Sequence, residues 1–133
     1  MHSIEYDETY SPIVIIKVPR RDLTNEEFDT LLDKLSHYNA SGRAGFVFDV
    51  RDTPPPSADR RRMIAERIDK DAKQYGCLSP SAVVVSSTLW VGIARVLSWL
   101  TQSNYENNTF NSVAEALVWL KSVLERDRTK QKR

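Results

Sequence analysis

Short apolar runs alternate with longer amphipathic stretches along the chain, and the runs predict strands. The segments Ile4–Tyr6 and Ile13–Val18 are rich in β-branched or aromatic residues, which favour strands. Gly45–Val50 and Ala82–Ser86 have the same character, and a continuous apolar run of this length is typical of a buried parallel strand. A shorter segment at Thr109–Phe110 predicts a last strand.

The stretches between these runs carry apolar residues three or four positions apart, which predicts amphipathic helices. The predicted helices run from Thr24 to Tyr38, from Ser57 to about Tyr75, from Ser87 or Thr88 to about Gln102, and from Ser112 to Leu124. Thr24 and Glu27 have the spacing of a capping box, in which both side chains satisfy free backbone N–H groups at a helix start. Ser112 and Glu115 repeat this spacing.

The expected order of elements is therefore β-β-α-β-α-β-α-β-α. Strands that alternate with helices of this length give right-handed crossovers and a mostly parallel sheet covered by helices. A chain of 133 residues is large enough for one hydrophobic core. We expect a single α/β domain over residues 1–125, followed by a basic tail at 126–133.

The positive charge of the chain is concentrated in this tail. Five of the tail residues are basic and one is acidic, so the net charge of +1 for the whole chain leaves the domain itself mildly acidic. A nucleic-acid-binding domain usually carries a basic stripe on its folded surface, so nucleic acid is not an expected partner. The tail fits either a frayed, solubilising terminus or a contact with an anionic partner.

The sequence does not predict a membrane span, a secretion signal or a metal site. The most apolar run, Leu89–Leu100, is interrupted by polar residues and is shorter than the roughly 20 residues of a membrane-spanning helix. The first residues lack the parts of a signal peptide, and Cys77 is the only cysteine, so a cytoplasmic location is expected. His2 is terminal and His37 falls on the polar side of its helix, which leaves no general base and no predicted cofactor. We therefore expect the chain not to be an enzyme.

The last third of the chain carries features of a known family. A strand at Ala82–Ser86 leads into a helix with Trp90, and a short strand with Phe110 leads into the closing segment Ala114–Leu120. This order resembles the STAS superfamily, and especially its SpoIIAA-like members. The resemblance implies the STAS-like fold and a non-enzymatic regulatory protein that docks to other macromolecules or holds a small ligand. In the anti-sigma factor antagonist branch a phosphorylated Ser or Thr follows the third strand, whereas three prolines interrupt the matching segment Asp49–Ser57 here.

The strongest candidate for a ligand site is the rim at the carboxyl ends of two predicted strands, where ligands of open α/β sheets bind. The candidate ligand-binding residues are Arg51, Thr53, Ser57, Arg61, Ser86, Ser87 and Thr88. Helix N-termini and hydroxyl groups favour an anion. Arg61 is expected on the inward stripe with Ile64 and Ile68, where a guanidinium can grip a phosphate or carboxylate. The alternative is that Arg61 only pairs with Asp52 or Asp59, while the hydroxyls cap helices.

Three apolar side chains fall outside or at the edge of the helical stripes and are candidates for an interaction surface. They are Val91, Trp99 and Trp119. If they are exposed, they supply hot-spot residues for a protein partner or a homodimer; the alternative is that they pack inside their own domain. The sequence therefore favours a regulatory or protein-interaction module. A carrier or sensor of an anionic or lipid-like ligand at the rim is the alternative function.

Overall fold

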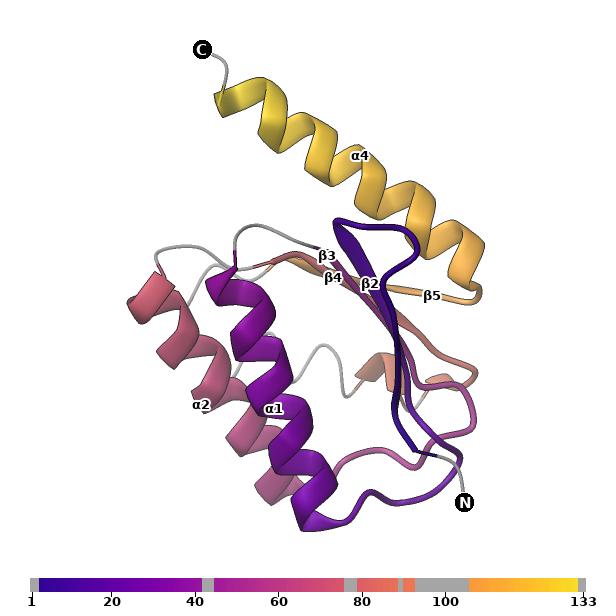
Figure 1. Cartoon of the computed structure of the whole chain (residues 1–133). Coiled ribbons are helices and arrows are strands. Elements are labelled where there is room, and N and C mark those ends of the chain that lie inside the picture. Colours follow the sequence, from indigo (N-terminus) through magenta and orange to yellow (C-terminus); the bar gives the residue numbers. More distant parts are fainter. Residues whose placement is uncertain (1–2, 42–44, 76–78, 89, 93–105, 132–133) are drawn as a thin grey trace.

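The structure of the chain is a computed structural model, and it describes residues 3–41, 45–75, 79–88, 90–92 and 106–131. Figure 1 shows a single sheet with α1 and α2 on one side and α4 on the other. This arrangement confirms the predicted fold class, an α/β protein with helices covering a mostly parallel sheet.

The sheet has five strands that lie in the order of the sequence. They are β1 (Glu5–Asp7), β2 (Ile13–Lys17), β3 (Gly45–Asp49), β4 (Ser81–Val84) and β5 (Asn107–Phe110). β1 pairs antiparallel with β2, and all other neighbours are parallel. Because each parallel connection moves one strand further in the same direction, right-handed crossovers place the intervening helices on the same face. The helix after β5 then covers the opposite face.

The described helices begin where the sequence predicts their caps. They are α1 (Asn25–Ala40), α2 (Ala58–Tyr75) and α4 (Val113–Gln131), and a further helix begins at Thr88. In the capping box of α1, the Glu27 amide donates to Thr24 Oγ1 at 3.1 Å and the Thr24 amide donates to Glu27 Oε1 at 2.9 Å. Ser57 Oγ accepts from the Arg60 amide at 3.3 Å, and Ser112 Oγ accepts from the Glu115 amide at 3.2 Å.

Helix α4 lies close to the sheet because the residues between them are small. Gly45 of β3 and Ala82 of β4 face it, and a Cβ on Gly45 would lie 3.2 Å from Leu120 Cδ2. Ala116 and Leu120 are fully buried in the same hydrophobic cluster. α4 accordingly contacts β3, β4 and β5 directly.

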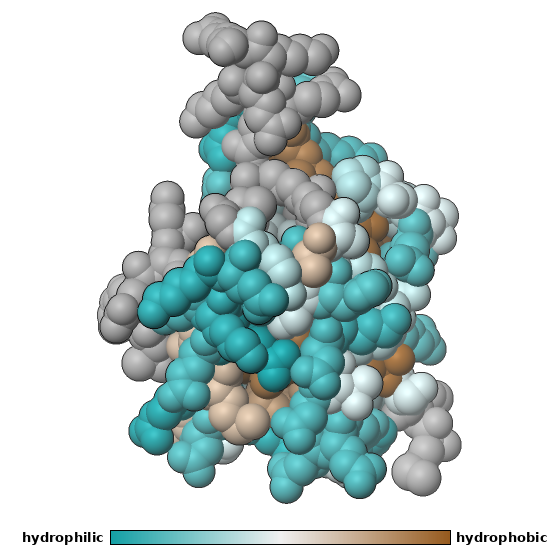
Figure 2. All heavy atoms as spheres, turned by 60° about the vertical axis from the view of Figure 1, so that its left-hand side comes forward, coloured by the Kyte–Doolittle hydropathy of each residue, from teal (hydrophilic) through white to brown (hydrophobic). Residues whose placement is uncertain are grey.

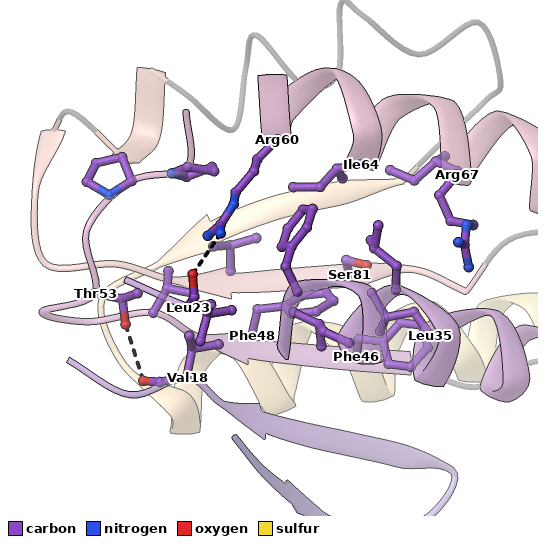
Figure 3. Close-up of a pocket in the computed structure, with 18 of the residues that line it drawn as sticks. Val18, Leu23, Leu35, Phe46, Phe48, Thr53, Arg60, Ile64, Arg67 and Ser81 are labelled. Atoms are coloured by element: carbon purple, nitrogen blue, oxygen red, sulfur yellow. Dashed lines mark hydrogen bonds between the residues drawn. The ribbon is translucent and has the colours of Figure 1, made fainter. Parts of the chain in front are cut away.

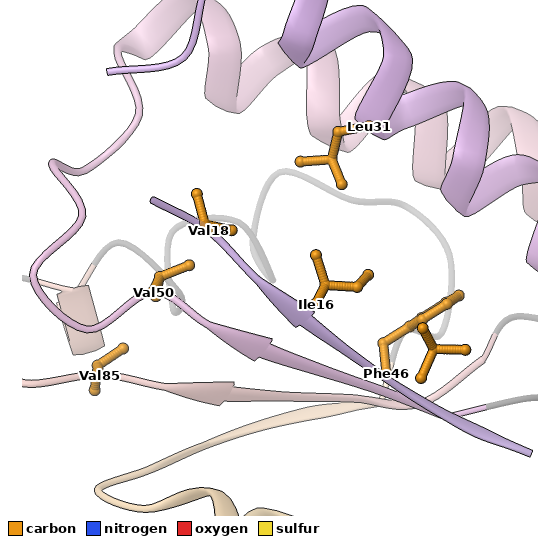
Figure 4. Packing of buried hydrophobic residues seen from close by; sticks show 7 residues of the cluster. Ile16, Val18, Leu31, Phe46, Val50 and Val85 are labelled. Atoms are coloured by element: carbon orange, nitrogen blue, oxygen red, sulfur yellow. The ribbon is translucent and has the colours of Figure 1, made fainter. Parts of the chain in front are cut away.

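Helices α1 and α2 stand further from the sheet. They contact each other more than either contacts any strand, and the face of the sheet below them carries large side chains, including Phe46 and Phe48. Figure 4 shows Leu31 of α1 pointing toward Ile16 and Phe46 from above the sheet. The space between these helices and the sheet holds the cavity described below.

Helix α4 is longer than predicted. It continues to Gln131, whereas the predicted helix ends at Leu124. Arg126 pairs with Glu106 at 2.8 Å, which ties the first residue of the predicted tail to the segment before β5. None of the helices in the described part of the chain is long and apolar enough to cross a membrane.

Candidate functional site

A cavity of about 630 Å³ lies between the sheet and the helices α1 and α2 (Figure 3). Phe46, Phe48 and Val83 line it from the sheet, and Leu35 and Ile64 line it from the two helices. Small-molecule sites typically have volumes of roughly 300–1,000 Å³ and mostly apolar walls with a few polar groups. The cavity therefore has the size and lining of a ligand site.

The outer surface of this side of the molecule is polar. Figure 2 brings the left-hand side of Figure 1 forward, and hydrophilic residues cover most of this surface, with hydrophobic ones visible between them. On α2, Arg62, Glu66 and Lys70 are exposed, whereas Ala65 is buried. The apolar character is thus concentrated inside, under the helices.

One end of the cavity is closed by the loop that follows β3. The Thr53 hydroxyl donates to the carbonyls of Val18 and Pro19 at 3.2 and 3.0 Å, and the Thr53 carbonyl accepts from Trp90 Nε1 at 2.8 Å. The prolines at 54–56 follow and line the cavity. Their fixed φ angles and these hydrogen bonds restrict the conformations that the rim can adopt.

Arg60 brings a positive charge to this end. Its Nη2 donates to the Leu23 carbonyl at 2.7 Å and to Asn25 Oδ1 at 3.2 Å, and its Cζ lies 5.0 Å from the centre of the Phe28 ring. Figure 3 shows the guanidinium reaching from α2 down toward Leu23. Stacking on an aromatic ring and hydrogen bonds to neutral oxygens fix the position of the guanidinium.

The opposite end of the cavity holds a polar network that joins α1, α2 and the segment before β4. The Ser36 hydroxyl lies 3.0 and 2.9 Å from the two carboxylate oxygens of Asp71, and Asn39 Nδ2 donates to Asp71 Oδ2 at 3.2 Å. Asn39 Oδ1 in turn accepts from the Ser79 hydroxyl at 2.8 Å. Arg67 Nη1 donates to Ser36 Oγ at 3.2 Å and pairs with Asp33 at 2.9 Å.

The predicted rim residues lie in several environments. Thr53 is buried and lines the cavity together with Ser57, which also caps α2. Ser86, Ser87 and Thr88 are exposed. Ser86 Oγ accepts from the Asp52 amide at 3.4 Å, and Ser87 Oγ accepts from the Trp90 amide at 3.4 Å.

The two predicted arginines, Arg51 and Arg61, are not among the residues that line the cavity. Arg51 Nε and Nη2 donate to the two carboxylate oxygens of Asp49 at 2.9 and 2.8 Å. These hydrogen bonds are the main reason that the pKa of Asp49 is lowered. Arg61 Nη1 donates to the Pro56 carbonyl at 3.0 Å. The residues that line the cavity include the neighbouring Arg60.

The residues of α2 that line the cavity differ from the predicted inward stripe, which held Arg61 in place of Arg60 and included neither Arg67 nor Asp71. The residues of α2 that line the cavity are Arg60, Ile64, Arg67, Ile68 and Asp71. Successive residues of a helix are about 100° apart, so Arg61 falls at the edge of the arc on which Ile64 and Ile68 lie. The spacing of Arg60, Arg67 and Asp71 could have identified them. They follow one another at seven and four positions, which places them on the same helix face as Ile64 and Ile68.

The predicted interaction residues mostly pack within the domain. Val91 is partly buried against the cluster between the sheet and α1. Trp119 is partly buried, and its ring lies 5.7 Å from that of Phe110. Trp99 lies outside the described residues.

A metal centre is not visible in the described part of the chain. No group of three or more His, Cys, Asp or Glu side chains there could hold a metal ion. Cys77 and His2 lie outside this part, and His37 is exposed on α1.

Comparison with known proteins places the fold. No protein-family sequence model matches the chain, and no curated protein matches it. Among solved structures, a protein of the DUF3478 family with a SpoIIAA-like fold from Shewanella loihica is 20% identical, with a TM-score of 0.62 over 90% of this chain and 95% of the other.

A second solved structure supports the same assignment. An anti-sigma-factor antagonist (STAS) domain protein from Planctomyces limnophilus is 15% identical, with a TM-score of 0.55 over 90% of this chain and 98% of the other. At these identities the likeness concerns the fold, and it confirms the resemblance seen in the sequence. The chain thus has a SpoIIAA-like fold, which the resemblance in the sequence implied.

Proposed function

We propose that this protein is a non-enzymatic carrier or sensor that holds an amphiphilic small molecule in the cavity between the sheet and helices α1 and α2. The observation that carries the proposal is the cavity itself, about 630 Å³ in volume and lined mainly by apolar side chains. Folded domains normally fill their interiors to the density of organic crystals. A cavity of this size between well-formed elements is therefore better explained by a ligand than by imperfect packing.

The polar groups at the two ends of the cavity support an amphiphilic rather than a purely apolar ligand. Arg60 and Ser57 lie near the rim, and Asp71, Asn39 and Ser79 lie at the other end. Ligand sites combine mostly apolar walls with a few polar groups that orient the ligand, so a ligand with polar ends fits this lining better than a hydrocarbon. The anionic or lipid-like ligand expected at the rim is compatible with this site.

The proposal includes binding without chemical conversion. In the described part of the cavity wall, the ionisable residues Arg21, Asp22, Arg60, Arg67 and Asp71 do not combine a nucleophile with a histidine or lysine base. Nucleophilic catalysis needs such a pair within hydrogen-bond reach. The cytoplasmic location stays a prediction from the sequence.

Calorimetric titration with dodecanoate tests the proposal. Dodecanoate has an apolar chain and one anionic head, and wild-type protein is expected to bind one molecule per chain. Val83 lines the cavity, so the substitution Val83→Trp should fill it and abolish measurable binding. Circular dichroism of the variant should remain that of the wild type, because the added ring occupies existing space.

Val118 provides a matched control. It lies on α4 and is 70% exposed, so Val118→Trp introduces the same side chain far from the cavity lining. This variant should bind dodecanoate as the wild type does. The proposal is overturned if wild type does not bind dodecanoate saturably, or if Val83→Trp and Val118→Trp bind it equally well.

The regulatory or protein-interaction role expected from the sequence stays a prediction. Its candidate surface depends on exposed side chains, but Val91 and Trp119 are partly buried within the domain. A homodimer would be detected by analytical ultracentrifugation of the purified chain. The cavity supports the carrier function more directly than the partly buried Val91 and Trp119 support an interaction surface.

A further inference from the structure

Arg60 and Asp71 lie near the two ends of the cavity side of α2, and the third charged residue there, Arg67, is already paired with Asp33. Arg60 lies in the first turn and Asp71 in the last part of the helix, and Ile64 and Ile68 lie between them. Asp71 lies eleven positions after Arg60, which corresponds to about 16 Å along a helix axis. The α2 side of the cavity therefore has Arg60 at one end and Asp71 at the other, with two isoleucines and the ion-paired Arg67 between them.

The charge of Arg60 is not neutralised by a carboxylate in the described part of the chain. Its Nη2 donates to a backbone carbonyl and to the side-chain oxygen of Asn25, both neutral acceptors. Arg67 differs, because Asp33 pairs with it at 2.9 Å. Nε and Nη1 of Arg60 make no hydrogen bond to described residues, so they are available to an anionic group. Carboxylates and phosphates are the groups that a guanidinium binds most strongly.

The second charged group is the carboxylate of Asp71, at the other end of the cavity. Its side chain belongs to a residue that is only 3% exposed, and its described partners, Ser36 and Asn39, are neutral. No described lysine or arginine lies within ion-pair distance of it. A buried carboxylate needs a compensating charge or a full set of hydrogen bonds. Its two oxygens have room for about four donors, so at least one acceptor position remains for a donor from the cavity.

We propose that the ligand is a bifunctional chain, with an anionic group bound by Arg60 at the rim and a hydrogen-bond donor bound by Asp71 at the far end. The inference rests on the proposed function and specifies the ligand of the same cavity. The middle of the ligand lies along Ile64 and Ile68, beside Arg67, whose guanidinium is already bound to Ser36 and Asp33. A hydroxyl and an ammonium group both provide the donor, and the two are separated by the test.

The first test compares three ligands by calorimetric titration of the wild-type protein. They are dodecanoate and its ω-hydroxy and ω-amino derivatives, whose chains match the separation of about 16 Å. At least one derivative should bind about tenfold more tightly than dodecanoate, because a hydrogen bond to a charged group contributes this much. The tighter of the two identifies the donor. If dodecanoate binds at least as tightly as both derivatives, the inference is overturned while the proposed function stands.

Substitutions at the two ends test each contact separately. Asp71→Asn preserves the shape of the side chain and should leave dodecanoate affinity unchanged, but reduce the advantage of the ω-amino or ω-hydroxy derivative to less than about threefold. Arg60→Gln should weaken dodecanoate binding about tenfold and leave binding of the uncharged dodecanol unchanged. An undiminished advantage in Asp71→Asn, or equal loss of dodecanoate and dodecanol binding in Arg60→Gln, contradicts the inference.

Arg61→Gln is the matched control for Arg60→Gln. Arg61 is the next residue of α2, but its guanidinium donates to the Pro56 carbonyl and does not line the cavity. The variant should retain wild-type affinity for all the ligands. If instead Arg61→Gln weakens dodecanoate and Arg60→Gln does not, the anionic group is bound at the sequence-predicted arginine and the proposed role of Arg60 is wrong.

Discussion

At the scale of single residues, Glu27 joins the start of α1 to the loop before it. Its carboxylate accepts from the Thr24 amide at 2.9 Å and receives two hydrogen bonds of 2.8 Å from the Arg21 guanidinium. The hydrogen bonds from Arg21, followed by the one from the Thr24 amide, lower the pKa of Glu27 to about 2. The ionised form is therefore favoured by the fold.

This lowered pKa predicts a pH-dependent contribution to stability. An unfolded glutamate has a pKa near 4.5, so the folded state gains from ionised Glu27 above that pH. The gain is lost as the pH falls from about 4.5 through about 2, where the folded form also takes up a proton. In urea unfolding followed by circular dichroism, wild type should exceed Glu27→Gln in stability above about pH 5, and the difference should disappear near pH 2.

Glutamine is the appropriate replacement because it also fits the capping box and does not titrate. Both proteins lose stability in acid through their other carboxylates, so the difference between them is the relevant quantity. A difference that stays constant from neutral pH to about pH 2 would show that the charge of Glu27 is not responsible.

The choice between Arg60 and Arg61 shows where sequence reasoning reaches its limit for a site. Arg60, Arg61 and Arg62 are consecutive, and the apolar residues of α2 define an arc wide enough to include either of the first two. Which one enters the cavity depends on the position of the Phe28 ring and the Leu23 carbonyl, which belong to another part of the chain. The hydrophobic pattern therefore predicted that an arginine of the first turn faces inward, but it could not distinguish Arg60 from Arg61.

At the scale of elements, α4 illustrates tight packing on the sheet. Leu120 is 0% exposed, and its side chain packs directly over Gly45, where a Cβ would lie 3.2 Å from Leu120 Cδ2. Leu120→Ala should lower the free energy of unfolding by about 2–5 kcal/mol, because it removes buried methyl groups and leaves a void in a closely packed region. Equilibrium urea denaturation measures this loss.

Val118 on the same helix is the comparison. It is 70% exposed, so Val118→Ala should change the free energy of unfolding by no more than about 0.5 kcal/mol. Comparable losses in both variants would show that the loss in Leu120→Ala does not come from packing on the sheet, since alanine favours the helix at either position.

Most strands and helices could be predicted because their signals are local. A β-branched run marked β2, alternating Phe and Val marked β3, and the capping residues Thr24, Ser57 and Ser112 marked the helix starts within a residue. β5 was predicted only in its second half, since Asn107 and Asn108 have no strand preference and are held by pairing with β4. The distance of α1 and α2 from the sheet could not be predicted, because an apolar stripe indicates which side faces inward but not how closely it packs.

At the scale of the whole molecule, the cavity predicts that a ligand stabilises the fold. A molecule that binds only the folded chain adds about 2.7 kcal/mol when present at roughly 100 times its Kd. For a chain of this size, that corresponds to a rise in Tm of roughly 10 °C. Dodecanoate should raise the Tm of wild type and Val118→Trp in differential scanning calorimetry and leave that of Val83→Trp unchanged. An equal rise in all three proteins would indicate binding elsewhere.

The contrast between the two faces of the sheet has a consequence for how this fold can diversify. The small residues Gly45, Ala82 and Ala116 hold α4 against one face, and none of them lines the cavity on the other. Under the proposed function, substitutions along the inner side of α2 would therefore change the ligand preference while the α4 side continues to maintain the scaffold. Ligand preference is expected to evolve rapidly in proteins built this way, through exchanges at a few positions of one helix and without a change of architecture.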